Sequence, residues 1–159
     1  MTKIMFVCHG NICRSPMAEF VFLDLVRKRG LEGRFFAASS AVSTEEIFGG
    51  IGNPVYPPAR AELKKQGIPF TERRAVQLKR TDYEEYDLFV CMDSGNVRGA
   101  LRILGSDPYM RVCKLMDFTD RGGDVADPWY SGRFDVAFRD IKLGCTALLE
   151  HLLNKQQKG

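Results

Sequence analysis

Short apolar runs alternate along the chain with longer amphipathic segments. Residues 3–8 read KIMFVC and residues 87–92 read DLFVCM, and both runs are apolar on both faces, as central strands of a parallel sheet are. Residues 35–40 and 112–116 predict two further strands. This alternation predicts a parallel sheet that is covered by helices on both faces.

The segments between these strands have the spacing of amphipathic helices. The first helix has Ser15 as its predicted N-cap and Pro16 at its first helical position, and it stops near Gly30. A loop rich in Gly and Pro, residues 49–58, leads into a second helix that ends at Gly67.

The second half of the chain repeats the pattern. A helix is predicted over residues 94–104, and residues 117–132 form a long loop dense in Gly and Asp. A long closing helix is marked by one apolar face, which comprises Phe134, Phe138, Ile141, Cys145, Leu148 and Leu152. Residues 154–159 read as a loose polar tail. The pattern predicts a single three-layer α/β domain over residues 1–159, with ligands bound where strands end and helices begin.

Composition and charge agree with a globular protein that acts on an anion. The chain has 159 residues, of which 45% are hydrophobic and 27% are charged, so it can bury a core without disulfide bonds. The net charge is +3, and the 23 Lys and Arg residues are scattered among 20 acidic residues. Nucleic-acid modules carry a denser basic stripe, so the charge favours an acidic substrate over nucleic acid.

Membrane and secreted classes are disfavoured. No apolar run approaches the ~20 residues of a membrane span, and the start of the chain lacks the length and cleavage site of a signal peptide. The five cysteines are an odd and sparse set, which is unlike a disulfide framework. We therefore expect a cytoplasmic protein with no membrane partner.

Candidate chemistry lies between the first strand and the first helix, where the sequence reads VCHGNICRSP. Cys8 ends the strand and Arg14 stands at the start of the helix, with Gly10 and Asn11 between them, two residues that tolerate left-handed backbone. Such a loop turns its N–H groups inward around an anion, at the positive end of the helix dipole. Arg14 adds a planar fork of donors, and the electropositive pocket favours the thiolate of Cys8. The arrangement predicts an oxyanion cradle with a nucleophile at its floor.

A phosphate ester would also require a proton donor for the leaving group. Only two histidines exist, His9 and His151, and His151 lies in the closing helix, so a carboxylic acid must serve. Asp127 is the best candidate because Pro128 stiffens its backbone and two aromatic rings follow. Asp120 and Asp124 are rival acids without these neighbours.

The loop and the DPWY sequence at residues 127–130 together resemble the low molecular weight protein tyrosine phosphatases. The likeness covers nearly the whole chain and continues through Gly52, Pro57, Gly67-Ile68, Cys91-Met92-Asp93 and Asn96. It implies a four-stranded parallel sheet with flanking helices, and hydrolysis of phosphotyrosine or aryl phosphate through a phosphocysteine intermediate.

The resemblance also implies a role for each matching residue. Cys8 would be the nucleophile and Arg14 the clamp on the phosphoryl oxygens, while Asp127 would protonate the leaving phenol and then activate water. The phosphate would be held by the loop, which comprises His9, Gly10, Asn11, Ile12, Cys13, Arg14 and Ser15.

The resemblance also implies residues that support the loop, that contact the substrate and that protect Cys8 by forming a disulfide. Ser15 would donate a hydrogen bond to the sulfur, and Asn11 would hold the loop in shape with Ser40 as its partner. Trp129 and Tyr130 would wall the aromatic slot, with His9 at its mouth. Cys13 would form a reversible disulfide with Cys8.

The resemblance implies no metal or organic cofactor, and it implies that a phosphate or sulfate ion can occupy the loop. His9 stands where the family is usually apolar, Tyr56-Pro57-Pro58 replaces a common Asp-Pro-Arg, and Arg73 stands where His is frequent, so these departures affect the rim. Ile12 is the bulky form of its position, which favours phosphotyrosine over phosphoarginine.

Two alternatives remain at this point. An arsenate reductase of the same fold would use the same cysteine but needs two further cysteines a few residues apart, and Cys91 has no such neighbour before Cys113. A non-catalytic phosphate-binding module would keep Arg14 and the loop but has no use for Cys8 and Asp127 together.

Overall fold

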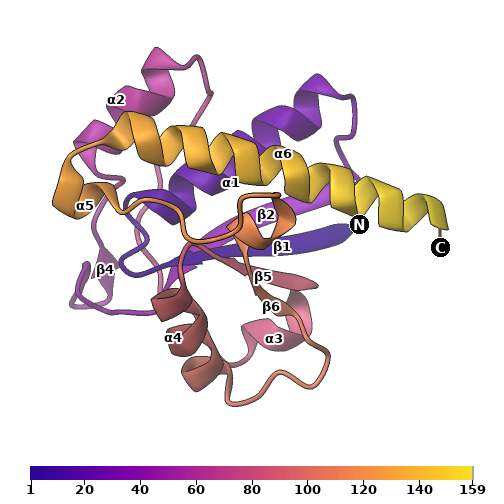
Figure 1. The fold of residues 1–159 in the computed structure, drawn as a ribbon. Coiled ribbons are helices and arrows are strands. Elements are labelled where there is room, and N and C mark those ends of the chain that lie inside the picture. Colours follow the sequence, from indigo (N-terminus) through magenta and orange to yellow (C-terminus); the bar gives the residue numbers. More distant parts are fainter. Residues whose placement is uncertain (159) are drawn as a thin grey trace.

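A four-stranded parallel sheet with the order β2-β1-β5-β6 forms the centre of the molecule (Figure 1). The computed structural model describes residues 1–158. The strands are β1 (Thr2–Cys8), β2 (Phe35–Ala41), β5 (Leu88–Cys91) and β6 (Val112–Lys114). Each crossover between parallel strands contains a helix, as the alternation in the sequence predicts.

Helices cover the sheet on both faces. Helices α1 (Arg14–Lys28) and α6 (Phe134–Lys158) pack together on one face, where α2 (Pro57–Lys65) also lies, whereas α4 (Ser94–Leu104) and the short α3 (Asp82–Glu85) lie on the other (Figure 1). Side chains of β1 alternate between the two layers: Ile4 and Phe6 belong to the core under α1 and α6, while Met5 and Val7 belong to the core under α4. The predicted fold class is confirmed.

The predicted elements are present with small shifts at their ends. Helix α4 has the predicted bounds, and Gly67 follows α2 with a left-handed φ of 71°. The strand predicted over 112–116 stops at Lys114, because a 3-10 helix, η1 (Leu115–Phe118), follows directly.

Several local predictions were wrong. Helix α1 begins at Arg14, so Ser15 and Pro16 are its second and third residues rather than its N-cap and first residue. The loop over 49–58 contains part of a hairpin, β3 (Ile47–Phe48) with β4 (Ile51–Gly52), and the loop over 117–132 contains a short helix, α5 (Pro128–Ser131).

The polar tail is also different from the prediction. Helix α6 has 25 residues and continues to Lys158, so residues 154–158 are helical, while residue 159 lies outside the described residues. Residues 154–157 are exposed, and the Gln156 side chain donates a hydrogen bond to the hydroxyl of Thr2, at the start of β1, at 3.3 Å. Among residues 1–158, no helix has both the length and the apolar character that crossing a membrane requires.

Candidate active site

The loop from Cys8 to Arg14 leaves the end of β1 and turns directly into α1. Asn11 has a left-handed φ of 60°, and its backbone N–H points at the Cys8 sulfur, 3.3 Å away. The N-cap position of α1 falls on Cys13, and no side chain caps the helix. The first N–H groups of α1 therefore remain available to an anion at the positive end of the helix dipole. This explains why Ser15 is not the cap: its hydroxyl is used inside the loop.

Cys8 lies at the floor of this loop and is 3% exposed. Its sulfur is 3.0 Å from the Ser15 hydroxyl, in addition to the Asn11 N–H. Hydrogen-bond donors directed at sulfur stabilise the thiolate, which is the nucleophilic form. The structure thus brings together a cysteine, a backbone N–H and a hydroxyl within hydrogen-bond distance of its sulfur, and a helix N-terminus.

Asn11 is fixed in its unusual conformation by four hydrogen bonds. Its amide nitrogen donates to the hydroxyls of Ser15 and Ser39, at 2.8 and 3.0 Å. Its amide oxygen accepts hydrogen bonds from Arg73 at 2.8 Å and from the Val76 N–H at 3.1 Å. A buried polar side chain with every group satisfied holds a loop rigidly.

We expected Ser40 to be the hydrogen-bond partner of Asn11, but the partner is the preceding residue, Ser39. Successive side chains of a strand point to opposite faces, and in β2 the face toward α1 carries Ser39. The Ser40 hydroxyl is buried and has no hydrogen-bond partner among the described residues. Sequence reasoning also missed the bond from Arg73, because no local pattern links residues 62 positions apart.

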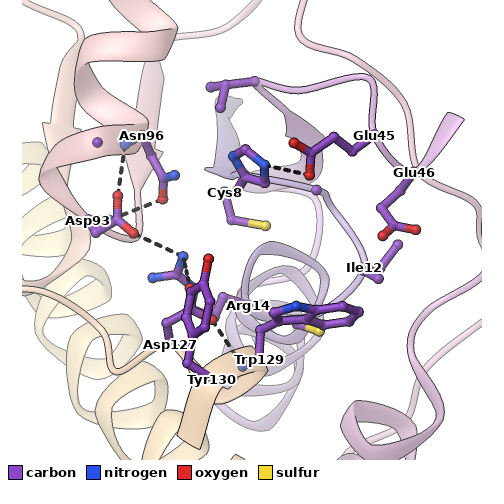
Figure 2. Close-up of a pocket in the computed structure, with 15 residues that line it drawn as sticks. Cys8, Ile12, Arg14, Glu45, Glu46, Asp93, Asn96, Asp127, Trp129 and Tyr130 are labelled. Atoms are coloured by element: carbon purple, nitrogen blue, oxygen red, sulfur yellow. Dashed lines mark hydrogen bonds and ion pairs between the residues drawn. The ribbon is translucent and has the colours of Figure 1, made fainter.

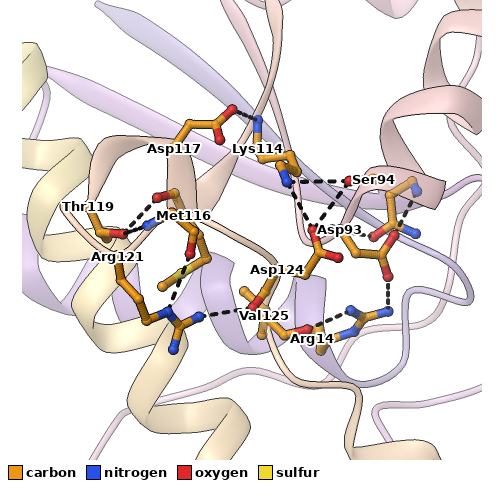
Figure 3. Close-up of polar contacts among 12 residues, drawn as sticks. Arg14, Asp93, Ser94, Lys114, Met116, Asp117, Thr119, Arg121, Asp124 and Val125 are labelled. Carbon is orange, nitrogen blue, oxygen red and sulfur yellow. Dashed lines mark hydrogen bonds and ion pairs between the residues drawn. The ribbon is translucent and has the colours of Figure 1, made fainter.

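Arg14 reaches into the pocket from the first turn of α1 and is 4% exposed. Its guanidinium lies 2.9 Å from a carboxylate oxygen of Asp93 and 3.5 Å from one of Asp127, and it donates to the Val125 carbonyl at 3.1 Å (Figure 2, Figure 3). Asp93 is also the N-cap of α4, where it accepts the Asn96 N–H at 2.8 Å. These contacts fix the orientation of the planar fork of donors.

Asp127 enters the same pocket from the loop before α5. One carboxylate oxygen accepts the Trp129 N–H at 3.0 Å, and the side chain is 37% exposed. The rival acids lie elsewhere: Asp120 is exposed and Asp124 pairs with Lys114 at 3.1 Å, and neither lines the pocket (Figure 3). Of the three candidates, Asp127 has the position of a proton donor.

The pocket has a volume of about 490 Å³, and one wall is aromatic (Figure 2). The Trp129 and Tyr130 side chains are exposed. The Trp129 ring packs against the Tyr56 ring, with 5.0 Å between the ring centroids. At the mouth, His9 is 2.9 Å from Glu45. The lining residues are Cys8, His9, Gly10, Ile12, Cys13, Arg14, Val42, Glu45, Glu46, Asp93, Gly95, Asn96, Asp127, Trp129 and Tyr130.

Comparison with known proteins decides the family. The sequence model of the low molecular weight phosphotyrosine protein phosphatases matches residues 3–158. The chain belongs to this family. A low molecular weight protein-tyrosine-phosphatase of Bacillus subtilis, YfkJ, is 36% identical, with 99% of each chain covered, and a Schizosaccharomyces pombe phosphatase is 38% identical, with 83% of this chain and 85% of the relative covered.

Solved structures give the same result. The crystal structure of YfkJ matches with a TM-score of 0.91 at 35% identity, over 98% of this chain and 96% of that one. A second neighbour is Wzb of Vibrio vulnificus in complex with benzylphosphonate, with a TM-score of 0.79 at 25% identity, over 94% of this chain and 98% of that one. The chain is therefore a protein-tyrosine-phosphatase by family, and its enzyme class is hydrolase.

The remaining cysteines of this phosphatase do not form a relay from Cys8. Cys91 lies in the core under α4, whereas Cys113 packs against the core under α1 and α6, on the opposite face of the sheet. Burial raises the pKa of the Cys113 thiol to about 12 and that of Cys91 well above its usual value. Two protonated thiols on opposite faces are unsuited to passing on a disulfide, which disfavours the arsenate reductase alternative.

Cys13 differs from these because it lines the pocket. Burial, with the neighbouring charge of Cys8, raises the pKa of its thiol to about 12, so it is protonated at neutral pH. Within residues 1–158, the structure contains no cluster of three His, Cys, Asp or Glu side chains arranged to hold a metal ion.

Proposed function

We propose that this phosphatase hydrolyses phosphotyrosine and related aryl phosphate monoesters, with Cys8 as nucleophile, Arg14 as clamp and Asp127 as general acid. The observation that carries the proposal is that Cys8 and Arg14, from the loop between β1 and α1, share one cavity with Asp127, which comes from the distant loop before α5. A non-catalytic phosphate-binding module would need Arg14 and the loop but not the other two.

In the first step, the Cys8 thiolate attacks the phosphorus atom in line with the phenolic oxygen. A sulfur–phosphorus bond forms, the phosphorus–oxygen bond breaks, and Asp127 gives its proton to the departing oxygen. Arg14 and the loop N–H groups hold the three non-bridging oxygens, on which the charge of a loose transition state is spread.

In the second step, Asp127 has become a carboxylate and takes a proton from water. The water oxygen attacks the phosphocysteine, inorganic phosphate leaves, and the thiolate is restored. The hydrogen bond from Ser15 stabilises that thiolate as a leaving group. The inorganic phosphate product, or a sulfate ion, would then occupy the loop.

The substrate class follows from the aromatic wall of the pocket. Trp129 and Tyr130 stand beside the phosphate loop and offer ring faces to a phenol (Figure 2). The Wzb neighbour is in complex with benzylphosphonate, which joins an aromatic ring to a phosphoryl group. A phosphotyrosine side chain combines the same two features.

The first test of this proposal is the Cys8→Ser variant, assayed on an aryl phosphate. Turnover should be abolished, while binding of the substrate remains measurable because Arg14 and the loop N–H groups are unchanged. The matched control is Cys113→Ser, which alters a thiol outside the pocket and should retain activity. Turnover by Cys8→Ser near the parent rate would refute the nucleophile assignment.

The second test concerns Asp127 and varies the leaving group. Asp127→Ala should lose on the order of 10²–10⁴-fold in rate on a phenol of high pKa, which is the usual size of general acid catalysis. The loss should shrink with a dinitrophenol, which departs as its anion without help. Asp120→Ala serves as the control and should show no dependence on the leaving group.

A further inference from the structure

The segment that carries Asp127 has no regular secondary structure of its own. We call residues 119–127 the acid loop; it runs from the end of η1 to the start of α5. It contains Gly122 and Gly123 with φ of 65° and 83°, two positions at which glycine leaves the backbone free to turn. The position of Asp127 therefore depends on contacts that other elements make with this loop.

One buried carboxylate makes two of these contacts. Asp140 lies on α6 and is 4% exposed. Its Oδ2 accepts the backbone N–H of Ala126 at 3.0 Å, and its Oδ1 accepts a hydrogen bond from Arg121 at 2.7 Å. The same guanidinium donates to the Asp124 carbonyl at 2.9 Å (Figure 3). Asp140 thus fastens the acid loop at the residue that immediately precedes Asp127.

The other contacts on the acid loop are of a different kind. The Val125 N–H bonds the Met92 carbonyl at 2.9 Å, which ties backbone to backbone. The pair between Lys114 and Asp124 lies at the surface, where an ion pair contributes about 0–1 kcal/mol. Arg14 reaches the loop from inside the pocket, at the Val125 carbonyl and the Asp127 carboxylate. Asp140 does not line the pocket; it holds the backbone N–H of the residue before Asp127 and also pairs with Arg121 of the loop.

We propose that Asp140, together with Arg121, is a positioning residue of the phosphatase reaction: it holds the acid loop so that the Asp127 carboxyl reaches the leaving oxygen. This inference rests on the proposed role of Asp127. A general acid acts over a heavy-atom distance of about 2.6–3.2 Å, and a misplacement of about 1 Å can cost roughly 10²-fold in rate. A clamp one residue away from the acid controls that distance.

The test uses Asp140→Asn, which keeps the shape of the side chain. A carboxylate accepts at both oxygens, whereas an amide has one acceptor and one donor group, so either Arg121 or the Ala126 N–H then faces another donor. The second variant is Arg121→Ala; the Arg121 side chain is 48% exposed, so its removal leaves the core intact. It keeps the test available even where Asp140→Asn does not fold.

We expect a loss that depends on the leaving group. With phenyl phosphate, kcat/KM of Asp140→Asn should fall by about 10- to 100-fold, and with dinitrophenyl phosphate by less than about 3-fold, because only the former needs the acid. Arg121→Ala should show the same selectivity with a smaller loss. In an Asp127→Ala background, Asp140→Asn should add less than about 2-fold, since the two residues act through one proton.

The matched control is Asp24→Asn. Asp24 is also a buried carboxylate on a helix, 5% exposed and paired with Lys28 at 2.9 Å, but it lies on α1 and does not contact the acid loop. Its substitution should change stability without changing the leaving-group dependence.

Two outcomes separate the inference from the function on which it rests. A selective loss in Asp127→Ala, with none in Asp140→Asn and Arg121→Ala, would overturn the positioning role and leave the proposed function intact. Equal losses on both substrates in Asp127→Ala would overturn the general acid itself, and the positioning role with it.

Discussion

At the scale of single residues, Cys13 has a chemistry that depends on its neighbour. It is buried, lines the pocket beside Cys8 and is protonated at neutral pH, because burial and the charge of Cys8 raise its pKa to about 12. It is therefore a poor target for peroxide itself. Its thiol is nonetheless available to react with a sulfenic acid formed on Cys8, which would give a disulfide and release water.

We expect mild peroxide to inactivate the parent enzyme reversibly, with full recovery in dithiothreitol. The Cys13→Ser variant should lose activity irreversibly under the same dose, because no second thiol traps the sulfenic acid before further oxidation. The measurement is the recovered activity after reduction, with Cys145→Ser as a control that leaves the pocket unchanged. Equal recovery of the parent and Cys13→Ser would rule out the trapping role.

Residue positions that follow from a local motif could be predicted from the sequence, and positions that depend on long-range contacts could not. Cys8, Arg14 and Asp127 could be proposed from their neighbours in the chain, and all three line one pocket. Asp93 was not assigned a role, although it pairs with Arg14, because that contact requires β1 and β5 to be adjacent. Arg73 was recognised only as a departure from the family, and its bond to Asn11 comes from the tertiary fold.

At the scale of elements, the packing of α6 against η1 leaves no room for a side chain at Gly144. A Cβ atom at this position would lie 2.5 Å from Cγ of Leu115, a fully buried side chain. In an exposed helix interior, glycine to alanine stabilises by roughly 0.5–1 kcal/mol. Here the added methyl has no space, and overpacking a core costs about 1–3 kcal/mol.

Gly144→Ala should therefore lower the free energy of unfolding by about 1–2 kcal/mol instead of raising it, as measured by urea denaturation. The control is a double-mutant cycle with Leu115→Ala, in which the clashing side chain is absent. In that background the alanine at 144 should be neutral or stabilising. A stabilising effect of Gly144→Ala alone would show that α6 can move away from η1 without cost.

The central strands could be predicted because burial on both faces makes them continuous apolar runs, and the long helices because burial of one face gives them a hydrophobic period. The short elements could not, since α5 and η1 have four residues each, too few to show a period. The start of α1 was also misplaced. Ser15 has the side chain of a good N-cap, but the sulfur of Cys8 and the amide of Asn11 compete for it inside the loop.

At the scale of the whole molecule, the pocket joins segments that are distant in sequence. The phosphate loop follows β1, Asp93 follows β5, and the acid loop leads to α5 and α6. Arg14 links the three through Asp93, the Val125 carbonyl and Asp127. An anion in the loop would bind to the same guanidinium, and binding energy would then oppose unfolding of every segment that forms the pocket.

Inorganic phosphate should therefore raise the unfolding temperature of the protein. At 100 times the dissociation constant, a ligand that binds only the native state contributes about 2.7 kcal/mol, and 1 kcal/mol corresponds to about 2–4 °C for a chain of this size. The measurement is calorimetry in phosphate against potassium chloride of equal ionic strength. Cys8→Ser should keep the increase, because the sulfur is not needed to bind the oxygens. Arg14→Ala should lose most of it, whereas an equal increase in Arg14→Ala would mean that phosphate stabilises the protein by exclusion from its surface and not through the loop.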